Sequence, residues 1–286
     1  MISYLYKAQE NNEASLDERD NLDLMTSAVR EAGELALEFF GDSKNGTWLK
    51  NDGTAVSDAD IAVDRLLHKR LLANRSDYGW LSEETDDNPE RLEKSHVWVV
   101  DPIDGTKAFL HNKPHWLVSV ALVVDGSVQM GCLYNPVKDE FFEAVRGAGA
   151  KLNGHPFQIE GQKDIEGATI ISAPGRFKSH FWPTPWPEIE SFIVNSVAYR
   201  MALVASNRAD AMLTLSGKSD WDLAAADLLV REAGGIVSDH KGGQFTFNRE
   251  NTRHPSVLVA NPSLHEKMLA RTKLVAARKR HGCQHN

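Results

Sequence analysis

At 286 residues, the chain is long enough to bury a substantial core in one large domain or in two fused ones. Hydrophobic residues make up 42% of it and charged residues 25%, the ordinary balance of a soluble globular protein. The net charge of −8 argues against a nucleic-acid-binding surface as the main role, and no apolar segment approaches the length of a membrane-spanning helix.

The first 20 residues are polar, with neither a basic start nor an apolar signal core, so export is not expected. The two cysteines, Cys132 and Cys283, offer no disulfide framework, which fits a reducing compartment. We therefore expect a cytoplasmic protein whose partners include neither a nucleic acid nor a membrane.

The N-terminal half of the sequence alternates between helical and strand patterns. Apolar residues recur at helical spacing over residues 22–40, and Gly41 ends this helix. Ser57 and Asp60 resemble a capping box at the start of a second helix. Asp125-Gly126 predicts a tight hairpin turn. Strands are expected at residues 79–82, 96–100, 117–124, 127–134 and 141–145.

The pattern changes near residue 155 and continues as mixed helix and strand. Residues 146–154 predict a glycine-rich turn, and residues 174–187, with four prolines, an irregular loop. Neither a repeat nor a low-complexity linker separates the halves, so they are expected to pack tightly. We therefore predict a mixed α/β (α+β) fold. Later strands are expected at residues 168–173, 211–215, 236–238 and 256–260, and helices at residues 199–206, 222–233 and 262–278.

The run Asp-Pro-Ile-Asp-Gly-Thr from Asp101 to Thr106 is the most informative stretch of the chain. It follows an apolar strand, so two carboxylates project from the strand end into a tight turn. Hard divalent cations bind clustered carboxylate oxygens with room for water and phosphate, and the outward N–H groups of such a turn suit a phosphate anion. Metal ligands beside a phosphate cradle predict phosphate-ester chemistry.

Taken alone, this run would more often be a surface turn, because Asp, Pro and Gly are common turn residues. Asp60 could likewise complete only its capping box, and Asp222 could simply cap its helix. The joint occurrence of several charged segments favours a functional site over these structural interpretations. The accompanying segments are residues 50–60, Glu83-Glu84 after a strand, and Trp221-Asp222 at a helix start.

In this order, the four segments resemble the inositol monophosphatase family of metal-dependent, lithium-sensitive phosphatases, which includes 3′(2′),5′-bisphosphate nucleotidases. The resemblance covers roughly residues 22–270. It implies an αβαβα sandwich with the site between two halves. Residues 1–155 would form an α+β half with most of the metal ligands. Residues 156–286 would form an α/β half that supplies Asp222 and substrate contacts.

Hydrolysis of a phosphate monoester requires neutralised charge, a water in line and a stabilised leaving alkoxide, and two metal ions about 3.5–4 Å apart can provide all three. The resemblance implies two or three Mg²⁺ ions per site. Glu83, Asp101 and the carbonyl of Ile103 would hold the first, and Asp101, Asp104 and Asp222 the second.

The same resemblance implies roles in catalysis and substrate binding. Thr106 would orient the attacking water, with Asp60 as its hydrogen-bond partner and Glu83 as a further acceptor. The N–H groups of Gly105 and Thr106 would receive the phosphate, and Lys107 would contact the substrate or point into solvent. Two peripheral residues complete the set: Lys50, which would balance charge, and Glu84.

Several positions depart from the inositol-specific branch. That branch has Thr-Asn after the threonine, whereas this chain has Lys107-Ala108. A lysine there resembles the branch acting on adenosine 3′,5′-bisphosphate, although that branch commonly has Glu at the next position, and Lys-Ala-Phe also resembles histidinol-phosphate phosphatases. Residues 214–220 lack the substrate-contacting glutamate, and residues 195–198 replace the usual Gly-Ser-Ala-Ala.

We therefore predict a magnesium-dependent phosphomonoesterase, with inositol monophosphate as the lead substrate. The alternatives are a 3′(2′),5′-bisphosphate nucleotidase, then a histidinol-phosphate phosphatase. A non-catalytic regulatory binding protein on the same scaffold is a further alternative from another class. A small phosphorylated metabolite is the expected partner, and the resemblance implies a homodimer.

Overall fold

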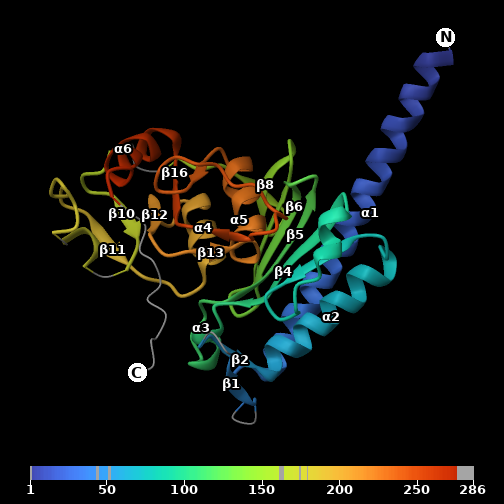
Figure 1. Cartoon of the computed structure of the whole chain (residues 1–286), viewed down its shortest axis with the longest axis horizontal. Coiled ribbons are helices and arrows are strands. Elements are labelled where there is room, and N and C mark those ends of the chain that lie inside the picture. The colour runs from blue at the N-terminus through green and yellow to red at the C-terminus, as the bar shows by residue number, and fades with distance from the viewer. Residues whose placement is uncertain are drawn as a thin grey trace.

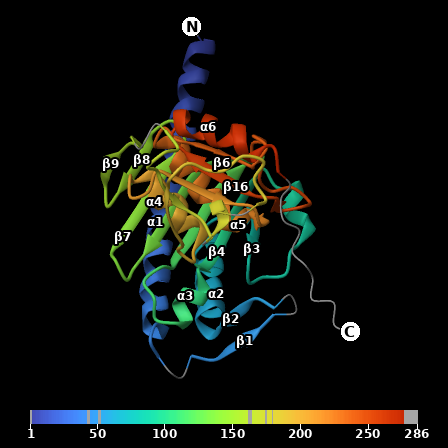
Figure 2. The same cartoon turned by 90° about the vertical axis from the view of Figure 1, so that its left-hand side faces the viewer.

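The computed structural model describes residues 2–42, 45–50, 53–160, 164–173, 175–178 and 180–275, with side chains from Glu18 onward. The helices are α1 (Ile2–Phe39), α2 (Asp58–Asn74), α3 (Thr106–Leu110), α4 (Val197–Ala205), α5 (Asp220–Glu232) and α6 (Pro262–Thr272), with 3₁₀ turns η1 (Pro89–Glu93) and η2 (Arg176–Lys178). The N-terminal end of α1 extends beyond the body of the molecule (Figures 1 and 2).

The strands form two large sheets and two small ladders. A mixed seven-stranded sheet has the order β3-β4-β5-β6-β7-β8-β9, and a five-stranded sheet the order β11-β10-β12-β16-β14. The small ladders are β1-β2 and β13-β15. The strand bounds are β1 (Thr47–Leu49), β2 (Ala55–Ser57), β3 (Gly79–Ser82), β4 (His96–Asp104), β5 (Leu117–Val124), β6 (Ser127–Asn135), β7 (Glu140–Val145), β8 (Gly149–Leu152), β9 (His155–Phe157), β10 (Thr169–Ile171), β11 (Glu190–Phe192), β12 (Ala211–Thr214), β13 (Lys218–Ser219), β14 (Ile236–Ser238), β15 (Arg253–His254) and β16 (Val257–Ala260).

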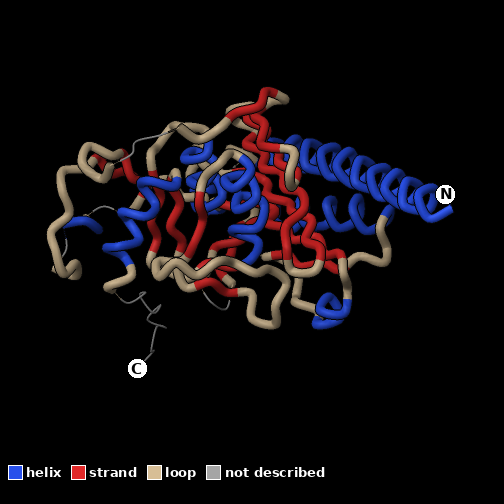
Figure 3. The backbone as a smooth tube through the Cα atoms, turned by 90° about the horizontal axis from the view of Figure 1, so that it is seen from above, coloured by secondary structure: helices blue, strands red, loops and turns tan. Residues whose placement is uncertain are grey.

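Helices and sheets alternate in layers, which confirms the predicted αβαβα sandwich. Helices α1 and α2 cover one face of the seven-stranded sheet, and α4 and α5 lie between its other face and the five-stranded sheet (Figures 1 and 3). Helix α6 packs on the outer face of the five-stranded sheet. The β1-β2 hairpin and α3 lie together at one end of the molecule (Figure 2).

Strand β4 shows how the sequence produces these layers. Val97 and Val99 join the core under α4 and α5, whereas Trp98 and Val100 join the core under α1 and α2. Successive side chains of a strand point to opposite faces, so a strand buried on both faces is apolar throughout. Continuing this alternation, Asp101 faces the layer that contains α5.

Helix α5 lies close against the seven-stranded sheet because small residues meet there. At Gly131 of β6, an added Cβ atom would lie 2.9 Å from the Cα atom of Ala225 in α5. Only glycine fits this contact without displacing backbone. The position of α5, and of the carboxylate in its first turn, therefore depends on this close approach.

Most of the elements predicted for the first half are confirmed within one or two residues, and the hairpin at Asp125-Gly126 joins β5 to β6 as expected. The predicted strand at residues 96–100 was too short, since β4 continues through a register shift to Asp104. The predicted turn at residues 146–154 contains β8, which pairs with β7. The N-terminal helix begins at Ile2 rather than at residue 22, because nothing before residue 22 interrupts it.

In the second half, the predicted helices and strands are present, with β14 (Ile236–Ser238) as predicted and the others with shifted ends. Helix α6 ends at Thr272, earlier than predicted, and residues 276–278 lie outside the described residues. The proposed boundary between residues 155 and 156 falls within β9, and the division into two halves stays a prediction. Cys132 is buried in β6, as a strand residue of the core, whereas Cys283 lies outside the described part. Among the helices described, none combines the length and apolar character needed to cross a bilayer.

We predict that Gly131→Ala lowers the free energy of unfolding by roughly 1–3 kcal/mol, the usual cost of overpacking a core. The added methyl group would push α5 away from β6. Urea denaturation measures the effect. Gln129→Ala, at a half-buried position of the same strand, is the matched control. Equal midpoints for the two variants would contradict the close contact.

Candidate functional site

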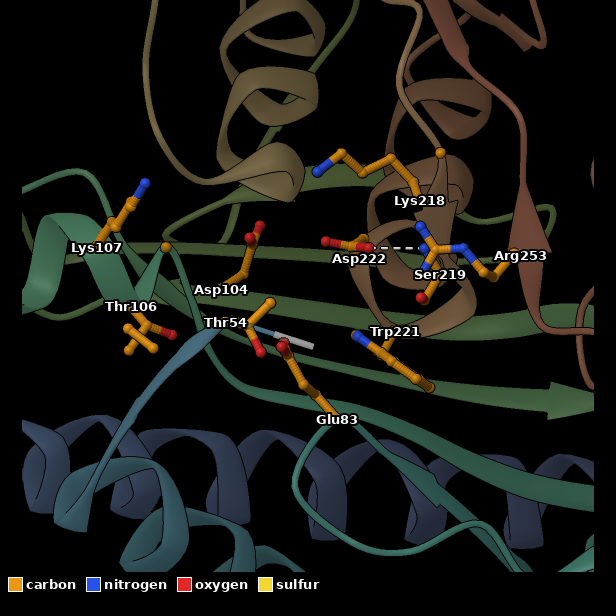
Figure 4. A pocket seen from close by; sticks show the side chains of 14 residues that line it. Thr54, Glu83, Asp104, Thr106, Lys107, Lys218, Ser219, Trp221, Asp222 and Arg253 are labelled. Carbon is orange, nitrogen blue, oxygen red and sulfur yellow. Dashed lines mark hydrogen bonds between the residues drawn. The ribbon is translucent and has the colours of Figure 1, made fainter. Parts of the chain in front are cut away.

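A pocket of about 310 Å³ opens between the end of β4, the start of α3, the first turn of α5 and the β13-β15 ladder (Figure 4). Ligand pockets usually measure roughly 300–1,000 Å³, so this one suits a small metabolite. Glu83, Asp104 and Asp222 line it together with Thr106 and Lys107. Segments far apart in the sequence thus meet in one cavity.

Three carboxylates converge at the base of the pocket. One oxygen of each of Asp101, Asp104 and Asp222 lies within 4.8 Å of the others. The register shift of β4 between Asp101 and Asp104 brings two of them to the same place. Glu83 lies beside Asp101, because β3 runs parallel to β4 and the Glu83 N–H donates to the carbonyl of Val100 at 3.2 Å.

Asp104 connects the strand to the start of α4. Its Oδ2 accepts hydrogen bonds from the Ser196 hydroxyl and the Ala198 N–H, both at 2.6 Å, and its Oδ1 accepts one from the Val197 N–H at 3.2 Å. Arg200 donates to the carbonyls of Val194 and Asn195, just before the helix. Residues 195–198 stood out in the sequence only as a replacement of the usual Gly-Ser-Ala-Ala, and the contacts of Ser196, Val197 and Ala198 with Asp104 were not predicted.

Asp222 is held by its own helix. Its Oδ2 accepts the Ser219 N–H at 2.7 Å, which completes a capping box at the start of α5. The capping interpretation of Asp222 is therefore correct, and the same carboxylate also belongs to the convergent cluster. One side chain meets both requirements because a carboxylate can accept about four hydrogen bonds or metal contacts.

Burial and mutual repulsion disfavour the charged forms of these carboxyls. Desolvation, followed by the charge of Asp222, raises the pKa of Glu83 to about 7 and that of Asp104 to about 6. Desolvation and the charge of Glu83 raise the pKa of Asp101 well above its usual value. Buried groups of like charge are stable only when some of them are protonated or when they bind a cation. The carboxylate cluster should therefore bind protons or metal ions.

The donor chemistry fits a hard divalent cation. Asp101 Oδ2 is buried and has no hydrogen-bond partner among the described residues, and a buried polar atom without a partner is costly. The donors that converge there are carboxylate oxygens, with neither thiolate nor imidazole in the lining of the described pocket. Such a set suits Mg²⁺ better than Zn²⁺.

Thr106 and Asp60 lie together beside the cluster and are joined by a hydrogen bond. The Thr106 hydroxyl is 3.1 Å from Asp60 Oδ1 and 3.2 Å from the carbonyl oxygen of Ile103. Asp60 Oδ2 accepts the N–H (2.8 Å) and the hydroxyl (2.6 Å) of Ser57. Asp60 therefore completes the capping box and contacts Thr106 at the same time. With both neighbours accepting, the lone pairs of the Thr106 hydroxyl remain available.

Lys50 pairs with the two glutamates that follow β3. Its Nζ lies 2.7 Å from Glu84 Oε2 and 3.6 Å from Glu83 Oε1, and it donates to the carbonyl of Glu83 at 3.2 Å. Burial raises the pKa of Glu84 while the Lys50 hydrogen bond opposes that shift. Lys50 thus compensates part of the negative charge at the edge of the site.

The turn after the cluster requires glycine. Gly105 has φ of 105°, and a Cβ atom there would lie 2.8 Å from the carbonyl oxygen of His115. Neither the Gly105 nor the Thr106 N–H donates to another group in the described chain. Lys107 follows, exposed, with its side chain at the pocket (Figure 4).

Two cationic residues of the pocket, Lys218 and Arg253, were not predicted from the sequence. Lys218 lies only four positions before Asp222, and this closeness in sequence to a predicted site residue could have identified it. Arg253 is brought to the pocket only by the pairing of β13 with β15, and a ladder of two residues per strand leaves no periodic pattern to detect.

Comparison with known proteins gives consistent matches over most of the chain. A sequence model of the inositol monophosphatase family matches residues 17–277. The inositol-1-monophosphatase of Mesorhizobium japonicum is 33% identical over 261 residues, which cover 88% of this chain and 96% of that protein. The histidinol-phosphatase of Chlorobaculum parvum is 32% identical over 237 residues (80% and 90%), and the Nus factor SuhB of Escherichia coli is 32% identical over 260 residues (87% and 94%).

Solved structures match the fold as well. The extragenic suppressor protein suhB from Bartonella henselae superposes with a TM-score of 0.76 at 28% identity, covering 88% of this chain and 98% of that one. An IMPase from Thermotoga maritima gives a TM-score of 0.75 at 24% identity, covering 89% and 97%. The layered arrangement described above is therefore shared with these proteins.

The raised pKa of Glu83 predicts how the metal-free protein responds to pH. The folded state retains the Glu83 proton up to about pH 7, whereas the unfolded chain releases it near the ordinary value of 4.5. The folded state binds more protons in this window, so this group's contribution to stability is lost as the pH rises through it. Glu83→Gln removes the titration and should raise the melting temperature of the metal-free protein at pH 8, with a difference that shrinks towards pH 4.5.

Melting curves in the presence of a chelator measure this effect, and 1 kcal/mol corresponds to about 2–4 °C for a chain of this size. Glu266→Gln, at an exposed position of α6, is the matched control. A Glu83→Gln variant that melts below the wild type at pH 8 would show that the charge of Glu83 is not penalised in the fold.

Proposed function

Because the chain belongs to the inositol monophosphatase family of phosphatases, we propose that it is a magnesium-dependent phosphomonoesterase that hydrolyses a small phosphorylated metabolite. The observation that supports this proposal most is the buried cluster of carboxylates with an unpartnered Asp101 oxygen, next to the paired Thr106 and Asp60. A non-catalytic binding protein would be indicated by loss of a carboxylate from the cluster, and the convergence of Asp101, Asp104 and Asp222 supports an enzyme instead.

Glu83, Asp101 and the Ile103 carbonyl would hold one Mg²⁺, and Asp101, Asp104 and Asp222 a second. Bound there, the ions would neutralise the charge of the phosphate and of the leaving oxygen and make the attacking water more acidic. Asp104 keeps a free lone pair on Oδ1 beside its hydrogen bond from Val197. Its three hydrogen bonds also fix the direction in which that lone pair points.

Thr106 and Asp60 would position the attacking water. The Thr106 hydroxyl donates to Asp60 and can accept a hydrogen bond from the water through its lone pairs. In the reaction, the water oxygen forms a bond to phosphorus, the ester P–O bond breaks, and a proton from the water ends on the departing alkoxide. Orientation of this kind acts on kcat, since it lowers the cost of reaching the reactive geometry.

The free N–H groups of Gly105 and Thr106 would receive the phosphate oxygens. Both residues line the pocket together with Asp104 and Asp222, and backbone N–H groups in a turn form a favourable site for an anion. Lys107 follows this turn and would contribute positive charge near the substrate. Lys50 and Glu84 would act at the periphery by balancing charge around Glu83.

Similarity alone does not choose the substrate. Relatives of nearly equal identity carry the names inositol-1-monophosphatase, histidinol-phosphatase and Nus factor SuhB. Inositol monophosphate, adenosine 3′,5′-bisphosphate and histidinol phosphate are therefore the three substrates to compare. The homodimer and the cytoplasmic location, both expected from the sequence, stay predictions.

We expect phosphate release to stop after exhaustive chelation and to return with Mg²⁺, whereas Asp101→Asn should stay inactive at any Mg²⁺ concentration. Asp101 would serve both ions, so its loss cannot be offset by mass action. Asp125→Asn, in the β5-β6 turn at a positive φ that asparagine tolerates, is the control. Full activity in the presence of chelator would refute the metal-dependent mechanism.

Thr106→Ala should lower kcat by about 10²-fold, the scale expected when a reacting group is misplaced. Thr106→Ser keeps the hydroxyl and should recover most of the rate. Steady-state kinetics at saturating Mg²⁺ distinguish this effect from weaker substrate binding, which would raise KM. Near-normal kcat for the alanine variant would exclude the proposed role of the hydroxyl.

A further inference from the structure

Asp64 is a buried carboxylate near the site that has no role in the function proposed above. It lies in α2, four residues after Asp60, and is only 7% exposed. Within the described residues, it belongs neither to the lining of the pocket nor to the convergent carboxylates. Burial of a carboxylate is unfavourable unless hydrogen bonds compensate for the lost water, so its partners explain its position.

Both oxygens of Asp64 accept hydroxyl groups from the segment that carries Glu83. Ser82 donates to Oδ1 at 2.5 Å, and Thr85 donates to Oδ2 at 2.7 Å. Ser82 is the last residue of β3, and Thr85 directly follows the pair Glu83-Glu84. One carboxylate of α2 therefore holds the chain on both sides of the two glutamates.

The backbone around Glu83 is fixed as well. The Glu83 N–H donates to the carbonyl of Val100 at 3.2 Å, and the Glu84 N–H donates to Ser82 Oγ at 3.3 Å. Because the Ser82 hydroxyl gives its proton to Asp64, its lone pairs are left to accept the Glu84 N–H. The Glu83 side chain extends from this bend into the pocket (Figure 4). The bend thus sets the direction of Glu83.

Helix α2 connects this bend with Thr106. Asp60 and Asp64 lie on the same face of the helix, because residues four positions apart lie one above the other. Asp60 contacts the Thr106 hydroxyl, whereas Asp64 contacts the bend that carries Glu83. Their separation along the helix is about 6 Å at 1.5 Å per residue. The helix is anchored in the core by Val63, Leu67 and Leu71.

From these contacts we infer that Asp64 is a positioning residue, which sets the direction of Glu83 and thereby the affinity of the site for Mg²⁺. The inference rests on the proposed function, in which Glu83 holds one of the ions. Asp64 acts through the bend from Ser82 to Thr85, since it does not itself line the pocket. Loss of a hydrogen-bond partner behind a metal ligand typically costs 10- to 100-fold in metal affinity or activity.

Asp64→Leu removes both acceptors and should raise the Kd for Mg²⁺ by roughly 10- to 100-fold in isothermal titration calorimetry. Asp64→Asn keeps one acceptor oxygen and should recover part of the affinity. The Mg²⁺ concentration for half-maximal phosphate release should rise in parallel. The kcat at saturating Mg²⁺ should stay near that of the wild type, because Thr106 and Asp60 are unchanged. Asp77→Asn, at an exposed position just after α2, is the matched control.

Glu83→Gln shows whether Asp64 acts through Glu83. In this background, Asp64→Leu should weaken Mg²⁺ binding little further, because the ligand that Asp64 directs is already lost. Equal losses in the two backgrounds would overturn the inference. So would a lower melting temperature of the metal-free protein with an unchanged Kd for Mg²⁺, the result of a purely structural role. Thr85→Val removes only an exposed hydroxyl, so it tests the same direction of effect with little risk to folding.

Calorimetry separates this inference from the proposed function, because it measures binding without turnover. A wild type that binds Mg²⁺ but releases no phosphate from the substrates compared above would refute the phosphomonoesterase. The Kd values of the Asp64 variants would still decide the role of Asp64. A wild type that binds no Mg²⁺ would refute both proposals.

Discussion

The main physical constraint on this structure is the unfavourable free energy of placing several negatively charged carboxylates close together and away from water. Asp101 and Asp104 are 1% and 5% exposed, and an oxygen of each lies within 4.8 Å of an oxygen of Asp222, while Glu83 lines the adjoining pocket. A site that binds an uncharged metabolite would not require such an arrangement, because desolvation alone makes it unfavourable. The fold must therefore hold the carboxylates against their repulsion, and it does so in part through the hydrogen bonds that Asp104 and Asp222 accept.

Several of these hydrogen bonds also begin helices. Asp60 completes the capping box of α2, Asp222 completes that of α5, and Asp104 accepts N–H groups at the start of α4. Each carboxylate is consequently fixed to the end of a rigid element by bonds that the helix needs in any case. The site geometry and the helix starts cannot vary independently. The capping interpretation of Asp60 and Asp222 is therefore confirmed, and it is compatible with their functional roles, which stay predictions.

Because the same carboxylates cap helices and belong to the site, local sequence patterns were enough to predict part of the site. Asp101 to Thr106 are contiguous, follow an apolar strand and have chemistry that can be recognised locally, and the capping residues have local spacing. The partners Ser196 and Arg253 could not be derived in this way, because their contacts arise from packing between layers and from a two-residue ladder. The early start of α1 was also missed, since polar residues before residue 22 form a helix without apolar periodicity.

The first turn of α5 connects the carboxylate cluster with the two cationic residues of the pocket, Lys218 and Arg253. Lys218 and Ser219 of β13 directly precede α5, Asp220 anchors β15 through His254, and Asp222 belongs to the cluster. A displacement of this turn would move the Asp222 carboxylate and the cations together. The distance between the two regions is therefore set by a few consecutive residues rather than by the packing of independent loops. If the proposed function holds, a pocket built in this way would select substrates by the spacing of their charges, because neither end can shift to accommodate a shorter or longer molecule without disturbing the other.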